Sequence, residues 1–304
     1  MNIWTVTNIT LNFITLVNTI LTIIICSLIF LLILIFHQRT RSIPIILAGH
    51  ASLILIISAC MLGSMCTSSL IGFVGIHLEQ HTNTTWCIIR GFCVHAFLCA
   101  LYDSYILQAT YRLCRVVFYR RKRLLSCRLY IILVPIETCF SILCISPVLF
   151  QNDVIYLPTE YYCQTPFTNI RAIMYVALRL FLLPLIFIIF VHICLLKYIR
   201  KMHNTTCRKR MKQDKRHLII TRRLLFMLGV LLLLGLPSVT FLAIYLITGH
   251  LFSLTYRIGW LSVSISLVFL AYMLIQLTAP LKKTVHKILS RASTSRDQGN
   301  GSND

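Results

Sequence analysis

Three ionisable residues, Asp103, Glu137 and Arg179, lie within long apolar stretches of the chain. A charged side chain in such surroundings is costly unless it has a partner. Two interpretations stay open: a ligand counter-ion or switch, or a structural pair that joins helices away from any ligand. The chain has no Gly-rich phosphate loop, HExxH or GxSxG motif, and two separated carboxylates do not support hydrolysis. We therefore expect no enzymatic activity.

The elements that must position these residues are apolar segments. Of the 304 residues, 58% are hydrophobic and only 12% are charged, whereas soluble domains are nearer a quarter charged. A helix of about 20 apolar residues crosses the hydrocarbon layer of a bilayer. The composition excludes a soluble enzyme, a disulfide-stapled secreted mini-protein and a disordered chain. It predicts an all-α membrane protein, a bundle of seven transmembrane helices at Leu11–Phe36, Ile45–Phe73, Trp86–Phe118, Leu129–Phe150, Ile170–Ile199, Leu218–Ile247 and Tyr256–Leu277.

The distribution of basic residues predicts the orientation. With the N-terminus outside, the stretches on the inner side hold 25 of the 29 lysines and arginines, as the positive-inside rule requires. The expected parts are an extracellular N-terminus (1–10), a seven-transmembrane domain (11–280), and a cytoplasmic amphipathic helix with a disordered tail (281–304). The net charge of +21 then needs no nucleic acid. It reflects either topology alone or contacts with anionic inner-leaflet lipid or an acidic partner.

Four residues on the predicted outer side are candidates for covalent modification. Asn8 and Asn83 each begin an Asn-X-Thr triplet, so either could carry a glycan. Cys87 begins the third segment and Cys163 lies in the second outer loop, so a disulfide between them is chemically reasonable. No cysteine and histidine spacing typical of zinc occurs. We expect no metal ion and no cofactor.

Seven spans, an outside N-terminus and this cysteine pair together resemble the rhodopsin-like (class A) G-protein-coupled receptors. In that family an arginine ends the third helix 25 residues after the loop-bonded cysteine, and the same count from Cys87 reaches Arg112. Kinked or hinged helices are expected at the family's proline positions, because proline removes a helix hydrogen bond. The matching residues here are Pro184, Pro237 and Pro280.

Several family positions carry other residues in this chain. Tyr111 stands where the acid precedes the arginine, and Gly235 replaces the aromatic switch residue of the sixth helix. Ala279 and Lys283 replace the Asn and Tyr around Pro280. Ala51 replaces the second-helix Asp, so no sodium site is expected.

The resemblance implies functional roles for further residues. Arg112 would reach into the cavity that opens for a heterotrimeric G protein. The third, fourth and fifth helices would pack together at overlapping depths, about 14 to 24 Å from their ends at 1.5 Å per residue, so Arg179 is expected to pair with Asp103, with Glu137 near by or protonated. The ligand pocket implied by the family is formed by Val94, His95, Leu98, Ser238, Phe241, Tyr245, Phe269 and Tyr272.

The expected function is therefore a plasma-membrane receptor that activates a G protein. Val94 stands where amine-binding members carry an Asp, so an ammonium ligand would lack a counter-ion. The unknown extracellular ligand is expected to be lipid-like, odorant-like or a peptide. The alternatives are a membrane transporter or channel subunit, although no internal repeat is visible, and a receptor-like scaffold that does not signal.

Overall fold

A computed structural model describes residues 3–37, 42–75, 84–118, 121–203, 229 and 235–277 of the chain. Within these ranges the structure is almost entirely helical, with one small hairpin. The elements in chain order are α1 (Ile3–His37), α2 (Ile43–Val74), α3 (Thr85–Val117), the 3-10 helix η1 (Lys122–Leu125), α4 (Cys127–Ile145), α5 (Pro147–Phe150), β1 (Ile155–Leu157), β2 (Tyr162–Gln164), α6 (Ile170–Ala177), the π-helix η2 (Leu178–Leu182), α7 (Leu183–His203), the helix Gly235–Thr248 and α9 (Thr255–Leu277).

Six of the described helical segments are long and apolar enough to cross a membrane. They coincide with six of the seven predicted spans, so the chain is an all-α, multi-pass membrane protein. The helix Gly235–Thr248 is shorter and apolar. It corresponds to the outer part of the predicted sixth span, and most of the inner part of that span lies outside the described residues. Pro280, Ala279 and Lys283 lie outside them as well.

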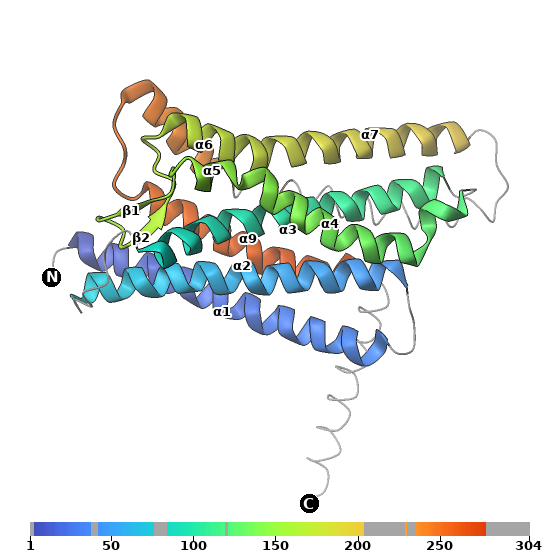
Figure 1. Ribbon diagram of the computed structural model, residues 1–304, viewed down its shortest axis with the longest axis horizontal. Coiled ribbons are helices and arrows are strands. Elements are labelled where there is room, and N and C mark those ends of the chain that lie inside the picture. Colours follow the sequence, from blue (N-terminus) through green and yellow to red (C-terminus); the bar gives the residue numbers. More distant parts are fainter. Residues whose placement is uncertain are drawn as a thin grey trace, which may run out of the picture.

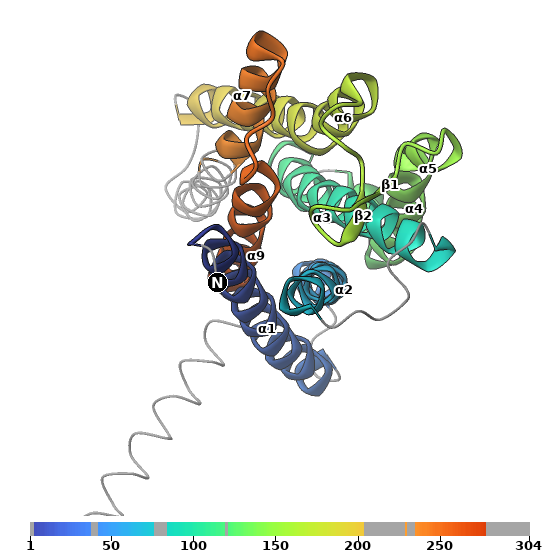
Figure 2. The same ribbon diagram turned by 90° about the vertical axis from the view of Figure 1, so that its left-hand side faces the viewer.

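The long helices run side by side and form one bundle (Figure 1). α3 has the widest set of neighbours, since it packs against α2, α4 and α7. α1 packs against α2 and α9 and closes the other side (Figure 2). The largest buried cluster joins these helices through small and branched residues such as Ala51, Leu55, Ala100 and Leu270. This packing fixes α3 as the element around which the candidate sites are built.

Two predicted spans depart from a single regular α-helix, each close to a proline. The predicted fourth span divides at Ser146, and Pro147 begins the short helix α5, because proline is well suited to the first turn of a helix. The predicted fifth span is continuous but contains the π-helix η2 directly before Pro184. A π-helical turn adds a residue to the helix and changes the direction of the side chains that follow.

The loop between α5 and α6, which we call the outer loop after the side predicted for it, forms a hairpin that the sequence did not predict. β1 and β2 pair antiparallel, and Tyr161 in the turn between them has a positive φ of 61°. The predicted disulfide between Cys87 and Cys163 is present and ties β2 to the outer end of α3. Gly91 permits this approach, since a Cβ there would lie 2.3 Å from the Cys163 carbonyl oxygen. The hairpin lies at the same end of the bundle as the N-terminus (Figure 1).

The first helix takes in most of the segment 1–10, which the sequence predicts to be extracellular. α1 begins at Ile3, so nearly all of this segment is helical. Apolar residues in Ile3–Thr10 continue the periodicity of the span, and the helix extends accordingly. Asn8 is only 3% exposed in this helix, which contradicts its prediction as a glycan acceptor because a glycan needs an exposed side chain. Asn83 lies outside the described residues.

Candidate functional site

The predicted ion pair between Asp103 and Arg179 is present in the middle of the bundle. Arg179 Nη2 lies 2.5 Å from Asp103 Oδ2, and Nη1 lies 3.3 Å from Oδ1. The Ser141 hydroxyl donates a further hydrogen bond to Asp103 Oδ2 at 2.6 Å. The two charged side chains are only 11% and 9% exposed. The bidentate contact and the additional hydrogen bond offset the free-energy cost of desolvating both charges. We call Asp103 and Arg179 the central ion pair.

Glu137 lies near this pair but does not take part in it. Its carboxylate oxygens are buried, and within the described ranges they have no hydrogen-bond partner. The closest basic group recorded is His50 on α2, whose Nδ1 lies 3.8 Å from Glu137 Oε2. His50 Nε2 bonds instead to the Thr138 hydroxyl at 2.9 Å. The three ionisable residues of the apolar segments therefore divide into a closed pair and a third carboxyl that faces another helix.

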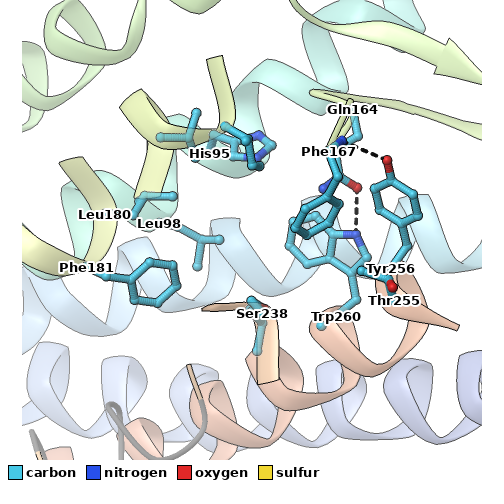
Figure 3. Close-up of a pocket in the computed structure, with 14 residues that line it drawn as sticks. His95, Leu98, Gln164, Phe167, Leu180, Phe181, Ser238, Thr255, Tyr256 and Trp260 are labelled. Carbon is cyan, nitrogen blue, oxygen red and sulfur yellow. Dashed lines mark hydrogen bonds between the residues drawn. The ribbon is translucent and has the colours of Figure 1, made fainter. Parts of the chain in front are cut away.

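A cavity of about 90 Å³ lies where the outer loop meets α3, α6, α9 and the helix Gly235–Thr248 (Figure 3). Three of the predicted pocket residues line it, namely His95, Leu98 and Ser238. Asp103, Glu137 and Arg179 do not. The ion pair is thus satisfied between helices and away from the cavity, which favours the structural interpretation over a ligand counter-ion.

The other predicted pocket residues do not line this cavity. Val94 is 1% exposed and packs in the main core, and Phe269 packs against the same core. Tyr272 on α9 is 53% exposed at the surface of the bundle. Phe241 and Tyr245, on the helix Gly235–Thr248, are also absent from the lining. For α9 the reason is depth: Phe269 lies nine residues, or about 13 Å, further along the helix than the lining residue Trp260.

The lining residues that the sequence did not predict come from the outer loop, from α6 and η2, and from the first turns of α9. On α9 the lining residues Tyr256, Gly259, Trp260 and Val263 follow the spacing of one helix face, a signal that the sequence did contain. The loop residues had no such signal, because the hairpin and the disulfide bring them over the cavity. The missed lining residues are Gln164, Phe167, Ile173, Val176, Leu180, Phe181, Thr255, Tyr256, Gly259, Trp260 and Val263.

A second buried polar cluster, also missed, joins the outer loop to three helices. Arg257 Nη2 lies 2.6 Å from Glu160 Oε2 as an ion pair without aligned hydrogen-bond geometry. Arg257 Nη1 donates to Asn12 Oδ1 at 2.8 Å and to Ser69 Oγ at 2.6 Å. The Ser69 hydroxyl donates to the Glu160 carbonyl oxygen at 2.8 Å. We call Asn12, Ser69, Glu160 and Arg257 the outer polar cluster; it holds the loop against α1, α2 and α9.

The outer polar cluster is buried as deeply as the central ion pair. The side chains of Arg257 and Glu160 are 2% and 6% exposed. The guanidinium also lies over the rings of Phe73 and Tyr162, 4.8 and 5.8 Å from their centres, where a cation is attracted by the aromatic face. Burial raises the pKa of Glu160 to about 7, and the nearby Arg257 guanidinium opposes this rise. Glu160 therefore titrates near neutral pH.

Arg112 lies near the inner end of α3 without the acid that the family has beside it. Within the described part of the chain, its buried Nη1 atom has no hydrogen-bond partner. Tyr111, which replaces that acid, is 8% exposed and packs edge to face on Tyr130 at 5.2 Å. Tyr111 is thus part of a small inner core rather than a partner for Arg112. The guanidinium has donors available for an incoming acceptor.

The described part of the chain contains no group of three or more His, Cys, Asp or Glu side chains that could hold a metal ion. No known protein-family model matches the sequence. No curated protein matches it significantly either. The geometry of this chain is therefore the basis for its proposed function.

Proposed function

We propose that the chain is a plasma-membrane receptor of the rhodopsin-like kind, with seven spans, an outside N-terminus and a cytoplasmic C-terminus. The observation that carries the proposal is the arrangement along α3. Its outer end is bonded through Cys87 to the loop that covers the cavity. Near its inner end, 25 residues on, Arg112 has a nitrogen without a hydrogen-bond partner among the residues that the structure describes.

The mechanism follows from these two ends. A non-aminergic extracellular ligand in the cavity contacts α3, α6, η2, α9 and the helix Gly235–Thr248. If it fits one arrangement of these helices better than another, it shifts the equilibrium towards that arrangement. Pro184 and Pro237 mark places where the helices lack a hydrogen bond and can bend. The cytoplasmic face then opens, and Arg112 binds a heterotrimeric G protein.

The basic inner surface supports the orientation. Arg115, Arg121, Arg123 and Arg128 lie at or between the adjoining ends of α3 and α4, where they would contact anionic inner-leaflet lipid. The opposite end carries the disulfide, which persists in an oxidising compartment.

Guanine-nucleotide exchange tests the proposal. Membranes containing the full chain are mixed with purified heterotrimers of each main G-protein class, and nucleotide exchange is measured with wild type, Arg112→Ala and Arg115→Ala at matched surface levels. We expect exchange above that of membranes without the chain, and a loss of roughly 30-fold in Arg112→Ala, as for an arginine at the centre of an interface. Arg115→Ala removes the same charge from an exposed position one turn away and should retain exchange.

Two results would contradict the proposal. Exchange that survives Arg112→Ala removes the role of this residue. The absence of exchange with every class, at normal surface levels, would favour a non-signalling scaffold, and solute uptake into proteoliposomes would favour a transporter.

A further inference from the structure

The cavity contains polar groups but no formal charge. Among its described lining residues there is no Asp, Glu, Lys or Arg. The charged side chains of the central ion pair and of the outer polar cluster are already paired, Arg179 with Asp103 and Arg257 with Glu160. A charged ligand would lose its hydration on entering the cavity without gaining a counter-ion, which is strongly unfavourable.

The hydrogen bond of His95 determines what this residue offers a ligand. Its Nδ1 lies 2.9 Å from the Gly91 carbonyl oxygen. A carbonyl oxygen only accepts hydrogen bonds, so Nδ1 carries the proton, and Nε2 of the neutral ring is an acceptor. Within the described residues no donor to Nε2 is recorded, although His95 is only 5% exposed. His95 therefore presents an unused acceptor in the lining of the cavity.

The other polar groups around the cavity are mostly occupied. Gln164 Oε1 accepts from Trp260 Nε1 at 2.8 Å, and the Tyr256 hydroxyl accepts from the Phe167 amide at 3.0 Å (Figure 3). These bonds fix the roof of the cavity, where the loop meets α9. Thr255 is 1% exposed, and its hydroxyl has no partner in the described part of the chain. Few polar atoms around the cavity thus remain available to a ligand, and His95 Nε2 is one of them.

We propose that this cavity binds a small uncharged molecule with an apolar body and one hydroxyl group, which donates its hydrogen bond to His95 Nε2. The inference rests on the proposed receptor function and deepens it, since it names the ligand class of the same site. Apolar side chains such as Leu98, Val176 and Val263 form the remaining wall. An alcohol donates its one hydrogen bond to the His95 acceptor and places the rest of its surface against this apolar wall.

The size of the cavity limits the ligand. About 90 Å³ equals the liquid volume of roughly three water molecules, less than the pockets that take drug-sized ligands. A neighbouring cavity of about 30 Å³ shares Leu98, Leu180, Phe181 and Val263 with it and is also lined by Gly235. Phe181 is close to the helix there, since a Cβ on Gly235 would lie 3.2 Å from its ring. Because Phe181 lines both cavities, a longer apolar tail reaches the second cavity past its ring.

Direct binding to the purified full chain tests the ligand class without any G protein. In the variant Trp4→Phe/Trp86→Phe, the one remaining tryptophan is Trp260, which lines the cavity and reports binding by its fluorescence. The probes are 1-butanol and its isomer methyl propyl ether, which has the same atoms but no donor, together with butylammonium and butyrate. We expect 1-butanol to bind about tenfold more tightly than the ether, as one hydrogen bond provides. The two ions should bind at least about a hundredfold more weakly than 1-butanol.

Variants at two positions connect the result to the proposed contacts. His95→Phe should make the alcohol and the ether equal by weakening the alcohol alone, and His95→Gln, which keeps an acceptor, should restore part of the preference. Gly235→Ala should weaken 1-hexanol about tenfold and leave 1-butanol unchanged, because it restricts Phe181. Thermal unfolding of each variant separates a loss of binding from a loss of the fold.

The proposal is overturned by equal binding of 1-butanol and the ether, by tighter binding of either ion, by no binding at all, or by a preference that survives His95→Phe. Its failure can be told apart from that of the receptor function. Alcohol binding without nucleotide exchange would leave the ligand class standing and remove the G-protein coupling. Nucleotide exchange by a chain that does not bind alcohols would support the G-protein coupling and remove the proposed ligand class.

Discussion

The central ion pair and the outer polar cluster are built from the same chemistry but join different parts of the molecule. Arg179 and Asp103 connect two spans directly, and the Ser141 hydroxyl and the Cys99 thiol also donate to Asp103. Arg257 meets Glu160 and also Asn12 and Ser69, so one guanidinium connects the outer loop with three helices. A buried charge can therefore serve either a single contact between helices or the closure of a whole end of the bundle.

The largest expected effect distinguishes these two uses. Arg257→Met should reduce the free energy of unfolding by about 3–5 kcal/mol, because it leaves Glu160 buried without its cation and removes the contacts to Asn12 and Ser69. Arg179→Met should cost less, about 2–3 kcal/mol, because Ser141 still bonds to Asp103. The measurement is unfolding of the purified variants in one detergent. Equal losses, or a greater loss for Arg179→Met, would show that the outer polar cluster is not the more extensive connection.

The pH dependence of stability sharpens the comparison, because Glu160 titrates near neutrality. Its pKa in the folded protein, about 7, lies above the ordinary 4.5. The protonated form is thus favoured by folding, so this contribution to stability is complete below pH 4.5 and is lost as the pH rises through 7. The change is on the order of 3 kcal/mol. Thermal unfolding of wild type and Glu160→Gln between pH 4.5 and 8 should show this decline only in wild type. A decline of the same size in the variant would assign it to another group.

Glu137 provides the smallest effect and a control for both clusters. Glu137→Gln should change the free energy of unfolding by less than about 1 kcal/mol, because its carboxylate has no hydrogen-bond partner to lose in the described residues. The amide also removes a buried carboxyl that faces His50 at 3.8 Å. A loss comparable to that of Arg179→Met, measured under the same conditions, would place Glu137 within the central ion pair.

The sequence predicted the central ion pair but not the outer polar cluster, for a physical reason. Asp103 and Arg179 interrupt apolar runs, and a charge in an apolar span requires a partner at the same depth. Glu160 and Arg257 lie in or beside predicted loops, where charged residues are ordinary. They are 97 positions apart, and the hairpin that brings them together was not visible in the hydropathy pattern.

The same difference applies to the fold and the cavity. Segment lengths and apolar composition predicted six spans that the structure contains. The Cys87–Cys163 bond was predicted because both cysteines fall on the predicted outer, oxidising side, and it is present. The pocket residues on α3, His95 and Leu98, were found because that helix has a clear reference point at Cys87. Phe269 and Tyr272 do not line this cavity, because their depth along α9 could not be compared with the position of the loop from the sequence. Spacing along one helix is readable from sequence, whereas the registration of a loop against several helices is not.

The central claim is that the chain crosses the membrane an odd number of times, with its start outside and its basic end inside. Epitope tags at the two termini, detected in the same cells before and after permeabilisation, test it most directly. The account predicts that the N-terminal tag is accessible on intact cells and that the C-terminal tag is detected only after permeabilisation. Two tags on the same side of the membrane would contradict it and remove the basis of the proposed receptor.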